Sequence, residues 1–236
     1  MDTIEIIIGI VLSILAGILA GFSTIYAFNR IPAKWLCDYG QEPDKGMWGV
    51  RIKQRPWTVI FTLVFIASSI KLMDQGAVYA IAGMLALWLL LQIGIADKMY
   101  MIIPDQYVIA LAITALGFIP SQVTYLSPLL GALIGGGSIL IIGLLGQLLF
   151  KKEAMGFGDV KLFTAIGLMS GTKGIIIILF MTFFISAIIY GIGLVARIIK
   201  SGDEQPLGPF IAGSTAAYII FNYEITTLVN IYLDLF

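Results

Sequence analysis

Long uncharged stretches of apolar residues dominate this chain and decide the solvent in which it can fold. A helix needs roughly 20 apolar residues to cross the hydrocarbon core of a bilayer, and such stretches recur along the sequence. With 59% hydrophobic residues over 236 positions, the chain carries more apolar surface than one soluble core could bury. The sequence therefore predicts an all-α, polytopic membrane bundle that forms a single domain over residues 1–236.

Eight stretches are candidates for membrane crossings. Seven are apolar runs of suitable length, and the eighth is a shorter run that begins at Asp159 and ends in a Ser-Gly-Thr-Lys-Gly turn. Together they cover residues 6–28, 57–73, 76–95, 106–120, 125–150, 160–171, 174–196 and 207–223. The longest polar connection is the segment 29–56, which we expect to form a loop at the membrane surface.

The basic residues are distributed unequally between the two ends of such a bundle. If the N-terminus lies outside, Lys71 and Lys173 face outside and the other lysines and arginines fall on the inner side. Because Lys and Arg are enriched in cytoplasmic loops, we expect the loop at 29–56 to lie on the cytoplasmic side of the cell membrane. The formal net charge is zero, so bulk charge gives no ground for a nucleic-acid partner.

Histidine is absent from the chain, and cysteine occurs once, as Cys37. Ser-His-Asp triads, HExxH zinc sites and Cys-rich zinc modules are therefore excluded. Hydrolytic chemistry would have to use carboxylates, a Ser/Lys pair or a metal held by oxygen. A carboxylate pair needs no metal, and we expect no cofactor.

Three aspartates at the inner ends of predicted crossings are the main candidates for chemistry. Charged residues at such positions are costly, and Asp97, Asp105 and Asp159 come to the same expected face from distant parts of the sequence. Taken singly, Asp97 could merely end a crossing, and the other two could be helix N-caps.

A pair of neighbouring carboxyl groups offers more than either group alone. Such a pair shares a proton and titrates as a unit. One member can then deprotonate a water while the other donates a hydrogen bond to a substrate carbonyl, as in aspartic proteases. Gly156 and Gly158, just before Asp159, would let a substrate backbone approach closely.

The segment Gly156-Phe157-Gly158-Asp159, with its flanks 153–155 and 160–162, resembles the second catalytic motif of the type IV prepilin peptidases, which are membrane aspartic proteases of the GxGD type. The first catalytic aspartate of that family precedes the aspartate of a Pro-Asp pair by eight residues, and Asp97 stands in this relation to Pro104-Asp105. The resemblance therefore selects Asp97 and Asp159 as the catalytic pair. It places Gly156, Gly158, Lys161, Pro104 and Asp105 around the substrate approach. Segments 206–212 and 21–32 are similar to further family signatures.

The resemblance implies an endopeptidase that cleaves type IV pilin-like precursors at the cytoplasmic membrane face, after the glycine that ends a short basic leader. The acidic loop residues Asp38, Glu42 and Asp44 are candidates for attracting that leader. Many bacterial members carry two CxxC pairs in the first cytoplasmic loop and also methylate the new N-terminus. Because this loop has only Cys37, we expect no zinc-bound loop, and the resemblance supports N-methyltransferase activity less than peptidase activity.

Two other functional classes stay open at this point. In an ion- or proton-coupled transporter, Asp97 and Asp159 would form a cation site, and broken helices and internal symmetry would accompany it. A Ser/Lys dyad would instead combine Ser68 or Ser69 with Lys71 at the opposite face. The sequence leaves open which aspartate acts as acid and which as base, and it does not fix the oligomeric state.

Overall fold

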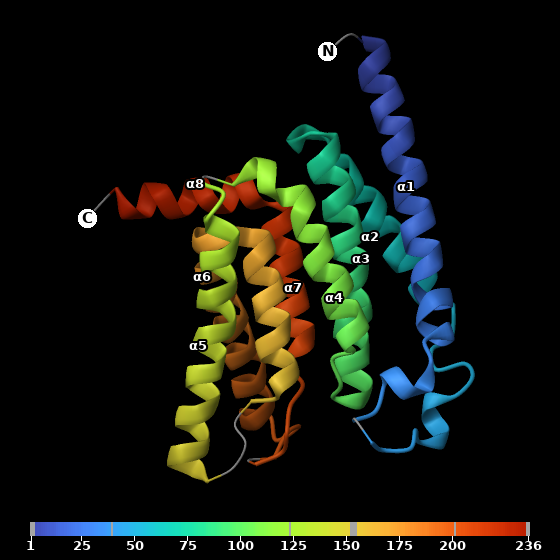
Figure 1. The fold of residues 1–236 in the computed structure, drawn as a ribbon. Coiled ribbons are helices and arrows are strands. Elements are labelled where there is room, and N and C mark those ends of the chain that lie inside the picture. The colour runs from blue at the N-terminus through green and yellow to red at the C-terminus, as the bar shows by residue number, and fades with distance from the viewer. Residues whose placement is uncertain (1–2, 39, 123, 152–154, 201, 235–236) are drawn as a thin grey trace.

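The structure, a computed structural model, describes residues 3–38, 40–122, 124–151, 155–200 and 202–234. Within these residues the chain forms eight α-helices and no strand, which confirms the predicted all-α bundle (Figure 1). The helices are α1 (Thr3–Arg30), α2 (Trp57–Leu72), α3 (Ala77–Tyr100), α4 (Asp105–Thr114), α5 (Ser127–Phe150), α6 (Phe157–Val195), α7 (Gly208–Ile220) and α8 (Asn222–Leu233). Short 3-10 turns lie at η1 (Ala33–Trp35), η2 (Lys45–Met47), η3 (Met73–Gln75) and η4 (Ala115–Ser121).

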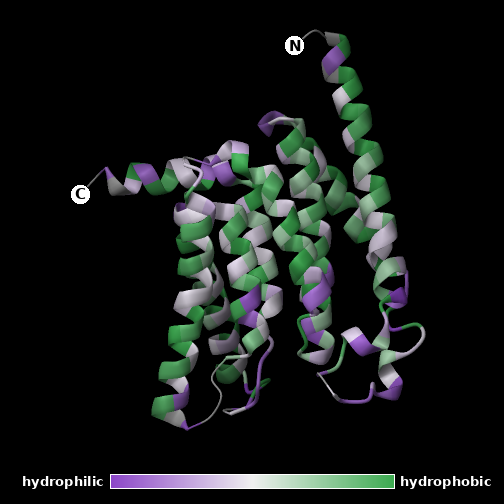
Figure 2. Ribbon diagram, viewed as in Figure 1, coloured by the Kyte–Doolittle hydropathy of each residue, from purple (hydrophilic) through white to green (hydrophobic). Residues whose placement is uncertain are grey.

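Five of these helices are long and apolar enough to cross a membrane by length and composition. They are α1, α2, α3, α5 and α6, while the segment Asp105–Ser121 and α7 are shorter apolar helices. Figure 2 shows hydrophobic residues along the bundle and polar ones gathered mainly at its ends and in the connection after α1. The chain is therefore a multi-pass membrane protein.

Helix α6 is two helical arms joined at Gly171 rather than one straight rod. Gly171 has φ +67° and ψ −171°, a backbone conformation outside the helical region that interrupts the run of 39 residues. Figure 1 shows the second arm returning beside the first. The two arms coincide with the predicted crossings 160–171 and 174–196, so the shorter predicted segment corresponds to the first arm.

The last predicted crossing, 207–223, is longer than the helix found there. Helix α7 ends at Ile220, and α8 then lies across the end of the bundle at a steep angle to α7 (Figure 1). The hydropathy of 207–223 did not reveal this turn because apolar residues continue through Ile220 and Phe221.

Close helix packing supports the arms of α6. Helix α5 makes its main contacts with α6, and the backbones approach so closely that a Cβ atom on Gly131 would lie 2.3 Å from the carbonyl oxygen of Gly167. The glycine-rich part of the fifth predicted crossing thus has the packing role that small residues commonly play between membrane helices. At the other side of the bundle, α1 packs mainly against α2.

The connection between α1 and α2 forms a small folded unit, which we call the cap (residues 31–56). It has its own core, in which Ile31, Leu36 and Met47 pack with Phe28 at the end of α1 and Ala96 on α3. Trp35 also contacts Tyr107 on α4 edge to face, with ring centroids 6.0 Å apart. The cap is therefore fixed against the ends of three helices, and we refer to this side as the cap end of the bundle.

Candidate functional site

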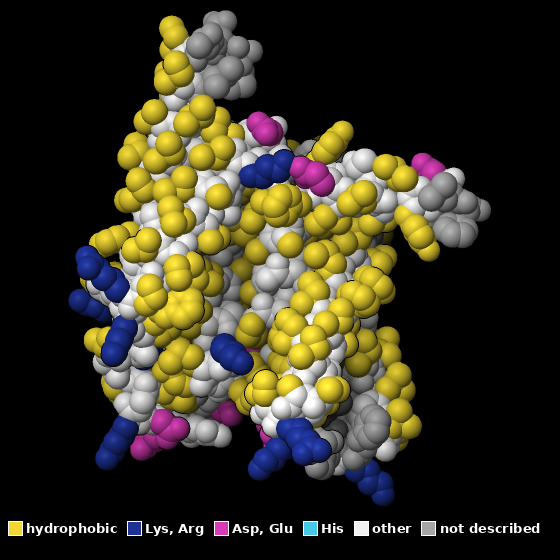
Figure 3. Space-filling view, turned by 180° about the vertical axis from the view of Figure 1, so that it is seen from behind, with side chains coloured by type: hydrophobic (Ala, Val, Ile, Leu, Met, Phe, Trp, Pro, Cys, Tyr) yellow, Lys and Arg dark blue, Asp and Glu magenta, His cyan; other side chains and the backbone are white. Residues whose placement is uncertain are grey.

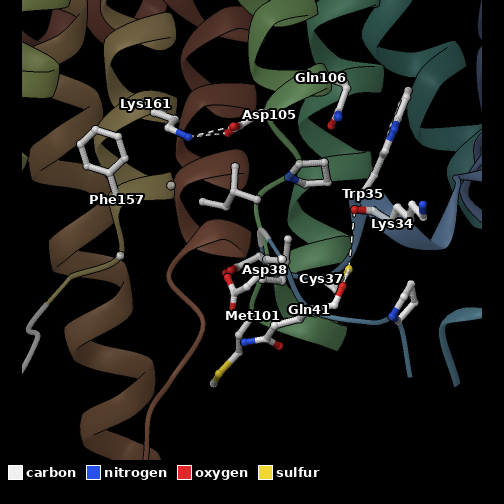
Figure 4. Close-up of a pocket in the computed structure, with 18 of the residues that line it drawn as sticks. Lys34, Trp35, Cys37, Asp38, Gln41, Met101, Asp105, Gln106, Phe157 and Lys161 are labelled. Atoms are coloured by element: carbon white, nitrogen blue, oxygen red, sulfur yellow. Dashed lines mark hydrogen bonds and ion pairs between the residues drawn. The ribbon is translucent and has the colours of Figure 1, made fainter. Parts of the chain in front are cut away.

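A cavity of about 1110 Å³ lies at the cap end of the bundle. Its walls come from three segments that are far apart in sequence: the cap, the turn between α3 and α4, and the start of α6 (Figure 4). The lining includes Lys34, Trp35, Cys37, Asp38, Gln41, Glu42, Asp97, Met101, Pro104, Asp105, Gly156, Gly158, Asp159 and Lys161. The structure thus brings all seven site residues named from the sequence to one cavity.

Asp97 lies in the last turn of α3 and is 6% exposed. Its Oδ2 atom accepts a hydrogen bond of 2.7 Å from the backbone N–H of Gly208, the first residue of α7. The first N–H groups of a helix lack partners within the helix and carry a partial positive charge, so they suit a carboxylate. The N-terminus of α7 therefore orients the Asp97 carboxyl group.

Asp159 lies in the first turn of α6, where it is half-buried. The extended Gly156 precedes the helix, and the Asp159 N–H donates to the Gly156 carbonyl at 3.1 Å. Gly158 packs near Ile103 in the turn after α3, so a Cβ atom there would lie 3.2 Å from the Ile103 Cβ. This contact brings Asp159 toward α3, close enough for its carboxyl group to interact electrostatically with that of Asp97.

Asp105 differs from the other two aspartates because it has a cation partner. Lys161 Nζ lies 2.8 Å from both carboxylate oxygens of Asp105, as the dashed line in Figure 4 marks. This ion pair joins the start of α4 to α6. Among the described residues, neither Asp97 nor Asp159 forms an ion pair.

The prediction that Asp105 and Asp159 are N-cap residues is wrong, because the N-cap of each helix lies one to three residues earlier in the chain. Pro104 occupies the N-cap of α4 and Gly156 that of α6, so each aspartate lies inside the first helical turn. Negative side chains are favourable there as well, because the turn carries the positive end of the helix dipole.

Glu153, in the flank of the GxGD segment, lies outside the described residues.

Two contributors to the site were not identified from the sequence. Gly208 belongs to the segment 206–212 that had been noted as a whole, but nothing in one sequence shows that it touches Asp97, 111 residues away. Tyr190, on the second arm of α6, donates its hydroxyl to the Pro206 carbonyl and so supports the start of α7. An isolated tyrosine in an apolar run gave no signal of this contact.

The alternative Ser/Lys site receives no support from the structure. Ser68 is buried and donates its hydroxyl to the Val64 carbonyl at 2.8 Å, while Lys71 pairs with Glu224 on α8. The hydrogen bond from Lys71 lowers the pKa of the Glu224 carboxyl group.

Across the described part of the chain, no group of three or more potential metal-ligating side chains gathers.

Comparison with known proteins adds an independent observation. The family model described as the type IV leader peptidase family matches residues 84–192, a range that contains both Asp97 and Asp159. A prepilin leader peptidase/N-methyltransferase of Xanthomonas campestris pv. campestris is 30% identical over 172 residues, covering 71% of this chain and 58% of the relative.

Other relatives of the same name give similar values. The one from Pseudomonas aeruginosa is 29% identical over 149 residues (61% of this chain, 51% of the relative), and that from Aeromonas salmonicida 31% over 135 residues (56% and 46%). The chain thus spans about half the length of the curated relatives it matches. No solved structure matches it. These matches confirm the resemblance seen in the motifs: over the range that contains both aspartates, the chain is similar to the type IV prepilin leader peptidases.

Proposed function

We propose that this protein is an aspartic endopeptidase that removes the leader from type IV prepilin-like precursors, with Asp97 and Asp159 as its catalytic pair. The observation that carries the proposal is the convergence of two carboxyl groups, from α3 and from α6, in one cavity at the end of the bundle. The family model covers both residues, and the curated relatives are named prepilin leader peptidases.

The pair can perform peptide hydrolysis with its own oxygens. The ionised carboxylate takes a proton from a water molecule as that water attacks the scissile carbonyl carbon, and the protonated partner donates a hydrogen bond to the carbonyl oxygen. The tetrahedral intermediate then collapses, and the leaving amine takes a proton from the pair. The hydrogen bond from Gly208 fixes one oxygen of Asp97, which leaves its other oxygen for the shared proton or the water.

The cap end of the bundle is the side that we assign to the cytoplasm. Basic residues of the described chain concentrate there, on the cap, at Lys98 and Lys161 and after α6, whereas Lys71 and Lys173 lie toward the α8 end. Figure 3 shows most of the lysine and arginine side chains of that face around its lower, cap end. This distribution follows the enrichment of Lys and Arg in cytoplasmic loops.

The charge of the cavity favours a basic leader. Asp38 and Glu42 of the cap line the cavity together with Asp97 and Asp159. Of the two lysines in the lining, Lys161 is paired with Asp105, which leaves Lys34 against these four acidic residues. A cavity lined mainly by one sign of charge raises the local concentration of an oppositely charged ligand. Asp44, also considered from the sequence, does not line this cavity.

The test is cleavage of a prepilin-like precursor by the purified protein in detergent, comparing wild type with Asp97→Asn and Asp159→Asn. These near-isosteric changes remove the carboxylate chemistry, so we expect cleavage to fall at least about 10³-fold in each while the thermal midpoint stays close to wild type. Asp74→Asn is the matched control, because Asp74 is exposed in η3 at the α8 end.

Full activity in either active-site variant would refute the assignment of the pair. Mass spectrometry of the mature product, with a methyl donor present, also shows whether the new N-terminus gains a methyl group. That readout addresses the N-methyltransferase activity in the relatives' names, which is separate from the peptidase proposal.

A further inference from the structure

Asn29 and Arg51 tie the two ends of the cap together. The guanidinium of Arg51 donates to the carbonyl oxygens of Phe28 and Ile31, each at 2.6 Å, and to that of Met47 at 2.9 Å. The Asn29 side chain accepts hydrogen bonds from the backbone N–H groups of Arg51 (2.8 Å) and Ile52 (3.0 Å) and donates to the Ile52 carbonyl at 2.9 Å.

The Arg51 contacts suit the chemistry of a helix end. Phe28 is near the C-terminus of α1, where the last carbonyl groups have no partner within the helix and carry a partial negative charge. A planar guanidinium presents several donors in a fixed fork, so one side chain can join the end of α1 to η2. A lysine ammonium is a point charge and cannot reproduce this fork.

The cap that this network holds is one wall of the cavity. Lys34, Trp35, Asp38, Gln41 and Glu42 face the cavity from the cap, opposite the walls that carry Asp97 and Asp159. Figure 4 shows the cap side chains Asp38 and Gln41 in the same view as Met101 and Phe157 of the other walls. A substrate in the cavity would therefore contact the cap and the aspartates at the same time.

We infer that Asn29 and Arg51 are positioning residues that hold the cap beside the aspartate pair and thereby set how tightly the precursor binds. The inference rests on the proposed function and adds to it the origin of substrate affinity. Neither residue lines the cavity, so each acts through the cap rather than on the substrate. Removing either one should loosen the cap and weaken substrate binding while the chemistry of the pair persists.

The experiment uses the whole chain of residues 1–236 in detergent, with the variants Arg51→Met, Arg51→Lys and Asn29→Ala. Lys53→Ala is the control, because Lys53 is an exposed basic residue of the same segment with no ion pair in the described structure. Hydrogen exchange is measured at the backbone amides of Trp35, Leu36 and Met47, which are hydrogen-bonded within the cap. In parallel, KM and kcat are determined for the precursor.

We expect exchange in the cap to accelerate at least about tenfold in the three variants, because each change removes several hydrogen bonds and a tenfold change corresponds to the loss of about one of them. Exchange in α3 should stay unchanged. The KM should rise by a similar factor with kcat within about twofold of wild type, and Arg51→Lys should resemble Arg51→Met because charge alone does not replace the fork.

Unchanged exchange in the cap would overturn the inference, because the network would then not hold the cap. Faster exchange with an unchanged KM would also overturn it, because the cap would then not contribute to binding. Failure of the proposed function looks different: wild type would not cleave the precursor at all, while the exchange comparison would still report whether Asn29 and Arg51 hold the cap.

Discussion

The contact between Gly208 and Asp97 allows a sharp test of how the proposed active site is built. A Cβ atom on Gly208 would lie 2.7 Å from both Cβ and Oδ2 of Asp97. Ordinary contacts between carbon atoms lie at about 3.5–4.0 Å, so Gly208→Ala requires a displacement of about 1 Å. The backbone of Gly208 lies outside the left-handed region, so alanine can adopt its conformation and the effect is steric.

Either the Asp97 carboxyl group or the start of α7 must move. Overpacking of this kind costs about 1–3 kcal/mol of stability, and misplacing a reacting group by about 1 Å costs up to roughly 10²-fold in rate. We therefore expect Gly208→Ala to lower kcat for precursor cleavage by about 10–100-fold, and to lower the thermal midpoint in detergent only moderately.

Gly213→Ala is the matched control for this prediction. Gly213 lies on the same helix, is exposed, and has no atom within 4 Å of the position of a Cβ. Alanine should leave kcat unchanged there and should add up to about 1 kcal/mol of helix stability. If Gly208→Ala kept more than half of the wild-type kcat, the close packing of α7 against Asp97 would not matter for catalysis, and the reasoning would fail.

Four further predictions follow from the same structure. Gly171→Ala should reduce the free energy of unfolding by about 1–3 kcal/mol and lower the thermal midpoint, because Gly171 has φ +67° and a Cβ there would lie 2.2 Å from the Gln122 side chain. Gly137→Ala is the control and should leave the thermal midpoint unchanged, because there is open space around Gly137. Lys161→Met should change stability by less than about 1 kcal/mol, because its ion pair with Asp105 is 39% and 55% exposed; a larger loss in thermal unfolding would contradict this. Cys37 lines the cavity, so a bound precursor peptide should shield its thiol. At a peptide concentration of ten times Kd, the rate of Cys37 alkylation should fall about tenfold, and a scrambled peptide should leave that rate unchanged. Cleavage should persist in the presence of a strong chelator, since two carboxyl groups suffice for the reaction; complete and reversible inhibition would show that a metal takes part.

The sequence predicted helix positions and candidate site residues best where a short local segment carries the whole signal. Hydropathy located the apolar helices, including the short arm at 160–171, because the apolar character of each segment can be read from its own composition. The family resemblance of the GxGD segment and of the Asp97 to Pro104-Asp105 spacing selected the two aspartates, which the structure places in one cavity.

Features that depend on contacts between distant segments were not predictable in the same way. The crosswise placement of α8 and the contact of Gly208 with Asp97 result from tertiary packing. The network joins Asn29, in the last turn of α1, to Arg51 of the cap, 22 positions later. In such a polar segment, neither periodicity nor composition distinguishes a structural arginine from a solvated one.

The lengths of the helices around the cavity have a consequence for the surrounding bilayer. The first arm of α6, from Phe157 to Gly171, and α7, of 13 residues, each extend only about 20 Å along their axes, at about 1.5 Å per residue. The hydrocarbon layer is about 30 Å thick, so it must thin beside them or admit water at one end. Both Asp159 and the Gly208 contact to Asp97 lie at the cap ends of these short elements. The proposed hydrolysis, which consumes water, would thus take place beside the shortest of these membrane helices, and its rate should depend on the acyl-chain length of the host lipid.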